Sequence, residues 1–237
     1  CMGDLHAGRI PERDLYRLLL QVPITLSARE LARRFPDRFA EAARACFGTE
    51  DPERVPDVPL RGAAMYGLAR VDRGGIMPAL LEAGTPATMS DFGRLMSITH
   101  DGDRLFAPTG GESHTGAADS GKNREYTGSR ERLSDDYLRE ALAAVEAGEP
   151  RRLREEPGFY GASTAELDRM VDVAQRVEGV LGAGLMGAGG GGYILILART
   201  GAFDGVRRAL LREYYEPLGL EPDVEPWHPT AAAGRLV

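Results

Sequence analysis

The chain has 237 residues, of which 43% are hydrophobic and 27% are charged, and its formal net charge is −7. This composition is ordinary for a soluble globular protein, and the acidic balance argues against a nonspecific nucleic-acid binder. No run approaches the roughly 20 apolar residues that span a bilayer. Two cysteines, Cys1 and Cys46, cannot form a disulfide framework, and the four histidines are scattered, so we expect a cytoplasmic protein without a metal site.

The first hundred residues, 1–100, are predicted to form a helical N-terminal portion. A short helix covers residues 12–22. Ser27 and Glu30 have the spacing of a capping box, which satisfies unpaired backbone N–H groups at a helix start. The helix that opens there runs to about residue 46, and Pro36 is expected to kink or break it.

Two further helices follow an acidic, proline-rich loop over residues 49–59. The first covers 61–73 and continues toward residue 81, and the second covers 89–99. The apolar residues that we expect to face the interior recur at helical spacing: Met65, Leu68, Val71, Phe92, Leu95 and Met96.

The tract over residues 101–134 differs in character from the helices on either side. It is rich in Gly, Ser and Thr and has almost no apolar anchor. A connection of this length is usually functional or disordered. We interpret it as a flexible polar insertion rather than an active-site lid, because nothing in it repeats a ligand-binding pattern.

The last third, residues 135–237, opens with a helix to about residue 147. Ser163 and Glu166 form a second capping box, and Gly179 ends the helix that follows. The remaining predicted elements are apolar strands over 183–186 and 193–198, a helix over 202–215 and an edge strand over 223–228. The order helix, strand, strand, helix, strand predicts an α+β fold with an antiparallel hairpin.

A glycine run, Gly182–Gly192, overlaps the first predicted hairpin strand and ends just before the second. Gly182, Gly184 and Gly187 have the spacing of a dinucleotide fingerprint, but that fingerprint needs a strand before it and a helix after it. Here a helix precedes and a strand follows, which argues against a dinucleotide site. Two interpretations remain open: tight packing of the hairpin on a neighbouring helix, and an anion-binding concavity of successive N–H groups.

Residues 160–168, with the glycine run behind them, resemble the C-terminal part of galactokinase, a member of the GHMP small-molecule kinases. The segment from Gly187 to Gly192 resembles the third, glycine-rich motif of that family. Upstream, Asp91–Met96 followed by His100 resembles the galactokinase helix that reads Phe-Gly-Arg-Leu-Met and ends in Ser-His. The resemblance implies a GHMP-kinase C-terminal-type domain, an antiparallel sheet with a glycine-rich hairpin covered by helices, and places the αββαβ portion in residues 135–237.

The chain also departs from the family. Sixty positions separate His100 from Tyr160, where galactokinases have few, and Ala188 stands where galactokinases tend to have Phe. The family's sugar-binding motif, phosphate-cradling motif and catalytic Asp do not occur in these residues. The resemblance therefore implies that this chain alone is inactive, and that an N-terminal half, in the same or another chain, supplies the site for ATP and Mg²⁺. The first residue, Cys1, suggests a start partway through a longer product.

The resemblance also implies which residues lie near the substrate. A loop next to the sugar and the phosphates is predicted for Gly187, Gly189, Gly190, Gly191 and Gly192, and no catalytic or metal-binding residue is expected in the chain. We expect structural roles for the remaining candidates: a helix-end position for His100, complementation of the helix dipole for Glu166 and Asp168, and packing for Trp227 and His228.

Two other functions stay open. The first is a non-catalytic relative that binds a sugar or a protein, and the second is a GHMP kinase that acts on a non-sugar alcohol. The segment over residues 160–168 favours a galactokinase-like sugar kinase over the second of these.

Overall fold

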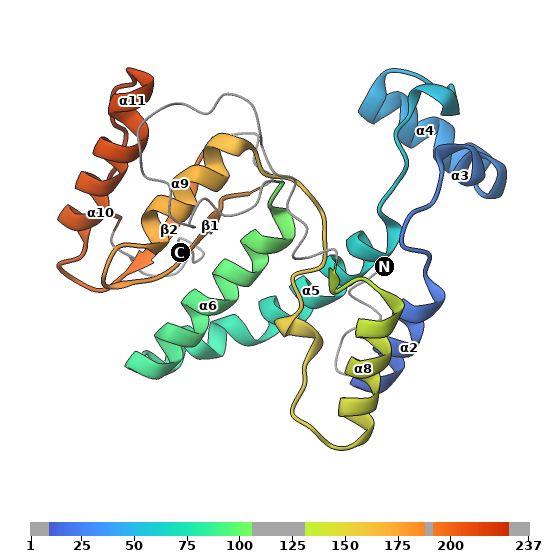
Figure 1. Ribbon diagram of the computed structural model, residues 1–237, viewed down its shortest axis with the longest axis horizontal. Helices are drawn as coiled ribbons and strands as arrows, with labels where there is room; N and C mark the ends of the chain where they lie inside the picture. The colour runs from blue at the N-terminus through green and yellow to red at the C-terminus, as the bar shows by residue number, and fades with distance from the viewer. Residues whose placement is uncertain (1–9, 106–130, 188–191, 228–237) are drawn as a thin grey trace, which may run out of the picture.

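The structure is a computed structural model that describes residues 10–105, 131–187 and 192–227 (Figure 1). Helices make up most of it, and two strands, β1 (Val180–Leu185) and β2 (Ile194–Ala198), pair antiparallel. The helices are α2 (Glu12–Gln21), α3 (Ala28–Arg34), α4 (Pro36–Phe47), α5 (Leu60–Ala83), α6 (Pro86–Asp103), α8 (Asp135–Glu146), α9 (Ala165–Gln175), α10 (Phe203–Leu210) and α11 (Glu216–Leu218), with 3-10 turns η1 (Pro52–Arg54) and η2 (Leu153–Glu155) and a π-helical segment η3 (Leu211–Tyr215). The predicted α+β class and the helix-covered antiparallel hairpin are confirmed.

The break between α3 and α4 has the cause that the sequence predicts. The Ser27 hydroxyl accepts the backbone N–H of Glu30 and caps α3, while Pro36 begins α4. The residue between them, Phe35, leaves the helical conformation, as residues before proline commonly do. The Glu30 carboxylate does not return to the cap, because it pairs with Arg33 and with a second arginine one residue on.

Both long helices extend beyond their predicted limits. Helix α5 continues to Ala83 and α6 to Asp103, with a capping box between Thr85 and Thr88 at the start of α6. Most of the expected apolar faces are inside, but Val71 is 39% exposed, so its predicted inward position is wrong.

Two main hydrophobic cores hold the chain together. The first lies where α2, α5 and α8 meet, and its fully buried side chains include Leu15, Tyr16, Leu19, Met65, Leu138 and Leu153. The second lies between α9, the hairpin and α10, and includes Met170, Val173, Val206, Leu210 and Tyr214. Helices α3 and α4 stand apart from both cores with a small core of their own (Figure 1).

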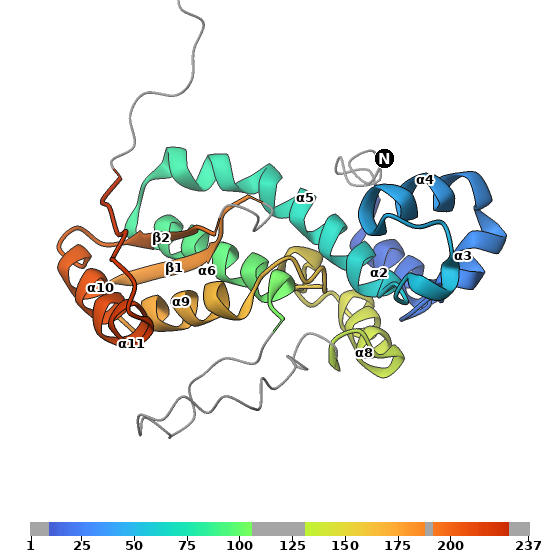
Figure 2. The same cartoon turned by 90° about the horizontal axis from the view of Figure 1, so that it is seen from above.

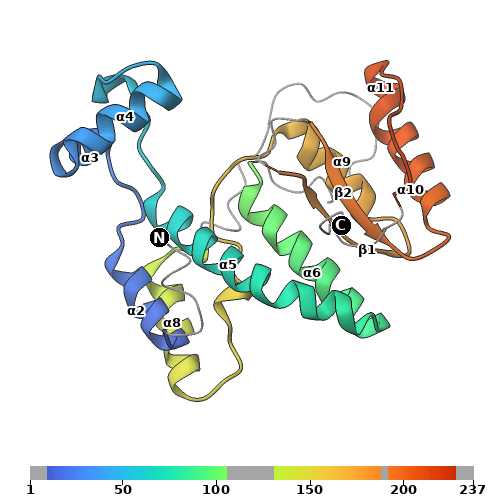
Figure 3. The same cartoon turned by 180° about the vertical axis from the view of Figure 1, so that it is seen from behind.

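The hairpin packs against α6 through β1 and against α9 and α10 through apolar side chains of both strands, and α6 and α9 also contact each other directly (Figures 2 and 3). On the α6 face the strand carries glycines: a Cβ on Gly182 would lie 2.0 Å from the Gly93 carbonyl oxygen, and one on Gly184 would lie 3.3 Å from His100 Cβ. Strand β1 thus advances along α6 in the same chain direction. Its C-terminal end, where the glycine turn begins, lies toward the C-terminal end of α6.

Several predicted details of the last third are wrong. Helix α9 is capped by Thr164 and not by Ser163, since the Thr164 hydroxyl accepts the Leu167 N–H. Helix α9 ends before Gly179, whose φ of +89° serves the turn into β1 instead. Residues 223–227 form no strand in the part of the chain that the structure describes.

Trp227 is 78% exposed, so it is not a packing residue. His228 and the rest of the C-terminal segment lie outside the described residues.

The expected boundary of the polar insertion falls inside α6. Residues 101–103 complete that helix, and Arg104 beyond it is 1% exposed, because its guanidinium is paired inside the protein. Residues 106–130 lie outside the described ranges, so the flexible character of the insertion stays a prediction, as does the division of the chain into three portions.

Candidate functional site around the end of helix α6

The glycine turn begins where β1 ends. Gly187 and Gly192, the two described members of the predicted loop, have φ of +67° and +73°, and a Cβ on either would meet nothing within 4 Å. Their conformation therefore requires glycine while their surroundings leave room. Gly189, Gly190 and Gly191 lie outside the described residues, so the position of that part of the loop is not tested.

Helix α6 ends in buried polar groups. His100 is 1% exposed and Asp168 is 2% exposed, with 3.4 Å between His100 Nε2 and Asp168 Oδ1. The second carboxylate oxygen of Asp168 accepts the backbone N–H of Leu105. Burial, and to a smaller extent the charge of Arg104, lowers the pKa of His100 to about 4. The ring is closed off from solvent, which fits the structural role expected for this histidine.

Asp168 lies in the first turn of α9, as expected, and its side chain is buried. Its carboxylate also accepts the Leu105 N–H and so holds the chain that leaves α6. Glu166 also lies at the helix start, where the hydrogen bonds it accepts there, from its own backbone N–H and from Thr164, lower the pKa of its carboxyl.

A buried ion pair and a buried tyrosine–carboxyl contact complete the end of α6. Arg104 Nη2 donates to Asp172 Oδ1 at 2.7 Å, and both side chains are buried. The Tyr66 hydroxyl donates to Asp103 Oδ2 at 2.8 Å, and burial raises the pKa of that carboxyl. These contacts join α6 to α5 and α9.

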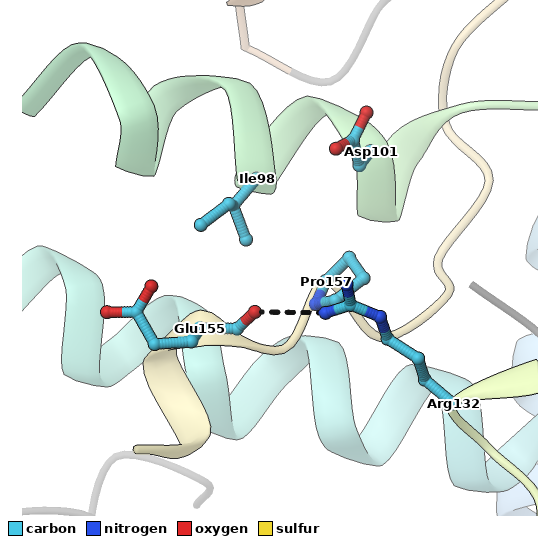
Figure 4. A pocket seen from close by; sticks show the side chains of 5 residues that line it. All are labelled: Ile98, Asp101, Arg132, Glu155 and Pro157. Carbon is cyan, nitrogen blue, oxygen red and sulfur yellow. Dashed lines mark hydrogen bonds between the residues drawn. The ribbon is translucent and has the colours of Figure 1, made fainter. Parts of the chain in front are cut away.

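On the face of α6 turned away from the hairpin there is a pocket of about 310 Å³ (Figure 4). Ile98 and Asp101 line it from α6, and Glu155, Pro157 and Arg132 line it from the opposite side. The Arg132 guanidinium donates to the Glu155 carbonyl oxygen at 3.4 Å, which holds the arginine against the pocket wall.

The fold thus brings together two residues that sequence reasoning treated separately, His100 and Asp168, and it places Gly184 of β1 against His100. It also adds four charged residues that the sequence analysis missed: Asp101, Arg104, Arg132 and Asp172. The available signal was the run Asp-Gly-Asp-Arg directly after His100. That run lacks apolar residues and is therefore typical of a polar loop, whereas in the structure its first three residues complete α6.

The described residues contain neither a metal-binding cluster nor a membrane-spanning helix. They contain no group of three or more His, Cys, Asp or Glu side chains that could hold a metal ion. Among the same residues, no helix is both long and apolar enough to cross a membrane.

Comparison with known proteins assigns the region around the hairpin. The family model described as GHMP kinases C terminal matches residues 138–216. A galactokinase of Thermosipho africanus is 33% identical over 64 residues, and a galactokinase of Thermotoga maritima is 36% identical over 63 residues. Each match covers 27% of this chain and 18% of the relative, so the similarity spans less than a fifth of either galactokinase. No solved structure matches.

The family match begins in α8 and ends at the first residue of α11, so it contains α9, both strands and the turn between them. Residues 138–216 are therefore a GHMP kinase C-terminal region, galactokinase-like in sequence.

Proposed function

We propose that the chain is the C-terminal part of an ATP-dependent, galactokinase-like small-molecule kinase that phosphorylates a sugar hydroxyl. The observation that carries the proposal is the hairpin of β1, glycine turn and β2 inside the region that matches the GHMP family. The similarity to two galactokinases supports a sugar over a non-sugar alcohol as the acceptor.

In this proposal the glycine turn, Gly187 with Gly189–Gly192, borders the substrate and the phosphates. Two features support a positional role. The turn leaves a strand whose backbone packs directly on α6, and both of its described glycines have positive φ with free space around them. A turn without side chains lets another surface approach the backbone closely.

We propose further that catalysis needs an N-terminal half, in the same or another chain, which supplies the nucleotide site with its Mg²⁺ and the catalytic carboxylate. Phosphoryl transfer depends on positioning and on neutralising charge at the phosphates. A cytoplasmic location, where ATP is available, is part of the proposal.

The test compares this chain with the full gene product that contains it, using ATP and a panel of monosaccharides that includes galactose. We expect phosphorylation of one sugar by the full product and no turnover by the chain alone. Turnover by residues 1–237 alone would refute the need for an N-terminal half. A full product that binds a sugar without consuming ATP would instead support the non-catalytic relative.

A further inference from the structure

The pocket beside α6 presents opposite charges from two different elements. Asp101 comes from the last turn of α6, and Arg132 comes from the segment that precedes α8 (Figure 4). Their side chains are 37% and 45% exposed, so each is partly shielded but can be reached from solvent. The remaining walls include two apolar side chains, Ile98 and Pro157.

Both charged groups retain hydrogen-bonding capacity. The nearest cation to Asp101 is Arg104, whose Nε lies 3.6 Å from Asp101 Oδ1, longer than an ordinary hydrogen bond. Arg132 uses Nη1 for the Glu155 carbonyl oxygen and for Glu156 Oε2, both at 3.4 Å. Within the described ranges its Nη2 and Nε have no hydrogen-bond partner, so two guanidinium nitrogens are available to a ligand.

The other carboxylate at the pocket is already neutralised. Glu155 pairs with Arg94, which comes from α6 one turn before Ile98. Asp101 and Arg132 therefore present one carboxylate and one guanidinium to the pocket, and each also has a long ion-pair contact outside it, with Arg104 at 3.6 Å and with Glu156 at 3.4 Å. Burial raises the pKa of Asp101, and the charges of Arg104 and Arg132 act in the opposite direction.

We propose that this pocket binds a small zwitterion of the amino acid class, with its ammonium group on Asp101, its carboxylate on Arg132 and an aliphatic side chain against Ile98 and Pro157. Charge-assisted hydrogen bonds are roughly twice as strong as neutral ones, and a guanidinium fits a carboxylate with two parallel N–H donors. A neutral hydroxylated ligand would form only the weaker kind. A ligand with one charge would leave the opposite wall of the pocket unpaired.

This site lies on a different face of α6 from the hairpin. Gly93 and His100 face β1, whereas Ile98 and Asp101 face the pocket. The inference therefore does not rest on the proposed kinase activity, and direct binding to this chain tests it without turnover.

The experiment measures binding of three ligands of nearly equal shape by calorimetry or ligand-observed NMR. Leucine carries both charges, leucinamide keeps only the ammonium, and 4-methylpentanoate keeps only the carboxylate. Since each charge-assisted contact is worth about tenfold in affinity, we expect leucine to bind about tenfold more tightly than either analogue. Ligands at about 10 mM allow millimolar affinities to be measured.

Two variants assign the contacts to residues. Asp101→Asn should weaken leucine and leucinamide but leave 4-methylpentanoate unchanged, and Arg132→Gln should weaken leucine and 4-methylpentanoate but leave leucinamide unchanged. Matched controls on α8 are Asp136→Asn and Arg139→Gln, at 98% and 61% exposed positions, which should bind all three ligands as the unchanged protein does. Thermal unfolding of each variant confirms that it is folded.

Three results would overturn the proposal: no binding of leucine, leucine no tighter than its analogues, or binding of a neutral monosaccharide in its place. If Asp101→Asn does not fold, Ile98→Phe, which reduces the pocket volume, gives a second test. It should abolish leucine binding, and unchanged binding by the folded Ile98→Phe variant would equally overturn the proposal.

Discussion

Gly93 of α6 and Gly182 of β1 put the backbones of a helix and a strand in direct contact. A Cβ on Gly182 would lie 2.0 Å from the Gly93 carbonyl oxygen, and a Cβ on Gly93 would lie 2.3 Å from the Leu181 carbonyl oxygen. Atoms cannot approach that closely, and a backbone carbonyl cannot rotate away as a side chain can. This crossing fixes where β1, and the glycine turn after it, lie relative to α6.

We expect Gly93→Ala to lower the free energy of unfolding by about 3 kcal/mol, at the upper end of the cost of overpacking. The matched control is Gly74→Ala in α5, where a Cβ would meet nothing within 4 Å. Because alanine favours the helix over glycine, the control should gain about 0.5–1 kcal/mol. Urea unfolding measures both values, and equal midpoints for the two variants would show that the crossing tolerates a side chain.

The buried ion pair between Arg104 and Asp172 gives the second prediction. Removing one partner leaves an uncompensated charge inside the protein, so Asp172→Asn should destabilise by about 3–5 kcal/mol. The exposed pair of Arg139 with Asp135 is the control, since Arg139→Ala should cost about 0.5 kcal/mol. Thermal or urea unfolding measures the loss of stability in both variants. Equal losses would contradict the prediction and would show that solvent reaches Arg104.

His100 makes stability depend on pH. Its pKa falls from an ordinary 6.5 to about 4 in the folded chain, chiefly because of burial. Between these values the unfolded chain binds more protons, so stability rises with pH, and about 3 kcal/mol is lost as pH falls from 6.5 to 4. The charged groups that lie around the ring are Arg104, Asp168 and Asp172.

The raised pKa values of Asp101 and Asp103 act in the opposite direction, because the folded chain keeps those protons longer as pH rises. The effect of the histidine is therefore measured as a difference. We expect unchanged protein to lose about 3 kcal/mol more than a His100→Gln variant between pH 7 and pH 4. If the unchanged protein and the His100→Gln variant lose the same stability between pH 7 and pH 4, His100 protonates in the folded chain as it does in the unfolded chain.

The fold was predictable wherever local chemistry determines it. Ser27 fixes the start of α3 through capping, Pro36 fixes the start of α4 through proline geometry, and two short apolar runs on either side of the glycines predict the hairpin. The failures depend on contacts between distant segments. Arg104 looks like a loop residue until Asp172, 68 positions away, pairs with it. Trp227 looks like a packing residue by its type, but no described element covers it.

The candidate site was less predictable than the fold for the same reason. The glycine run identified the hairpin, but not the surface on which it packs. That surface is α6, and its residues Gly93 and His100 entered the sequence analysis only through resemblance. Spacing along one chain cannot show that Asp101 and Arg132 face one pocket, because the tract over residues 106–130 separates them.

The glycine turn provides a test that separates function from stability. Gly187 and Gly192 have φ of +67° and +73° with free space around them, so alanine at either costs about 1–2 kcal/mol of backbone strain and no clash. Gly201, with φ of +93° and equally free surroundings, lies beyond the other end of β2 and serves as the matched control. All three variants should unfold at similar denaturant concentrations.

Their effects on catalysis should differ if the turn borders the substrate and phosphates. In the full gene product, Gly187→Ala and Gly192→Ala should lower kcat/KM by about 100-fold, as misplacement near reacting groups does, while Gly201→Ala leaves it within about twofold. Gly201→Ala reports the effect of a side chain at a positive φ away from the turn, so any loss of kcat/KM beyond it measures how close the turn lies to the reaction. If Gly187→Ala, Gly192→Ala and Gly201→Ala have equal kcat/KM, the turn does not border the reacting groups and the hairpin serves only in packing.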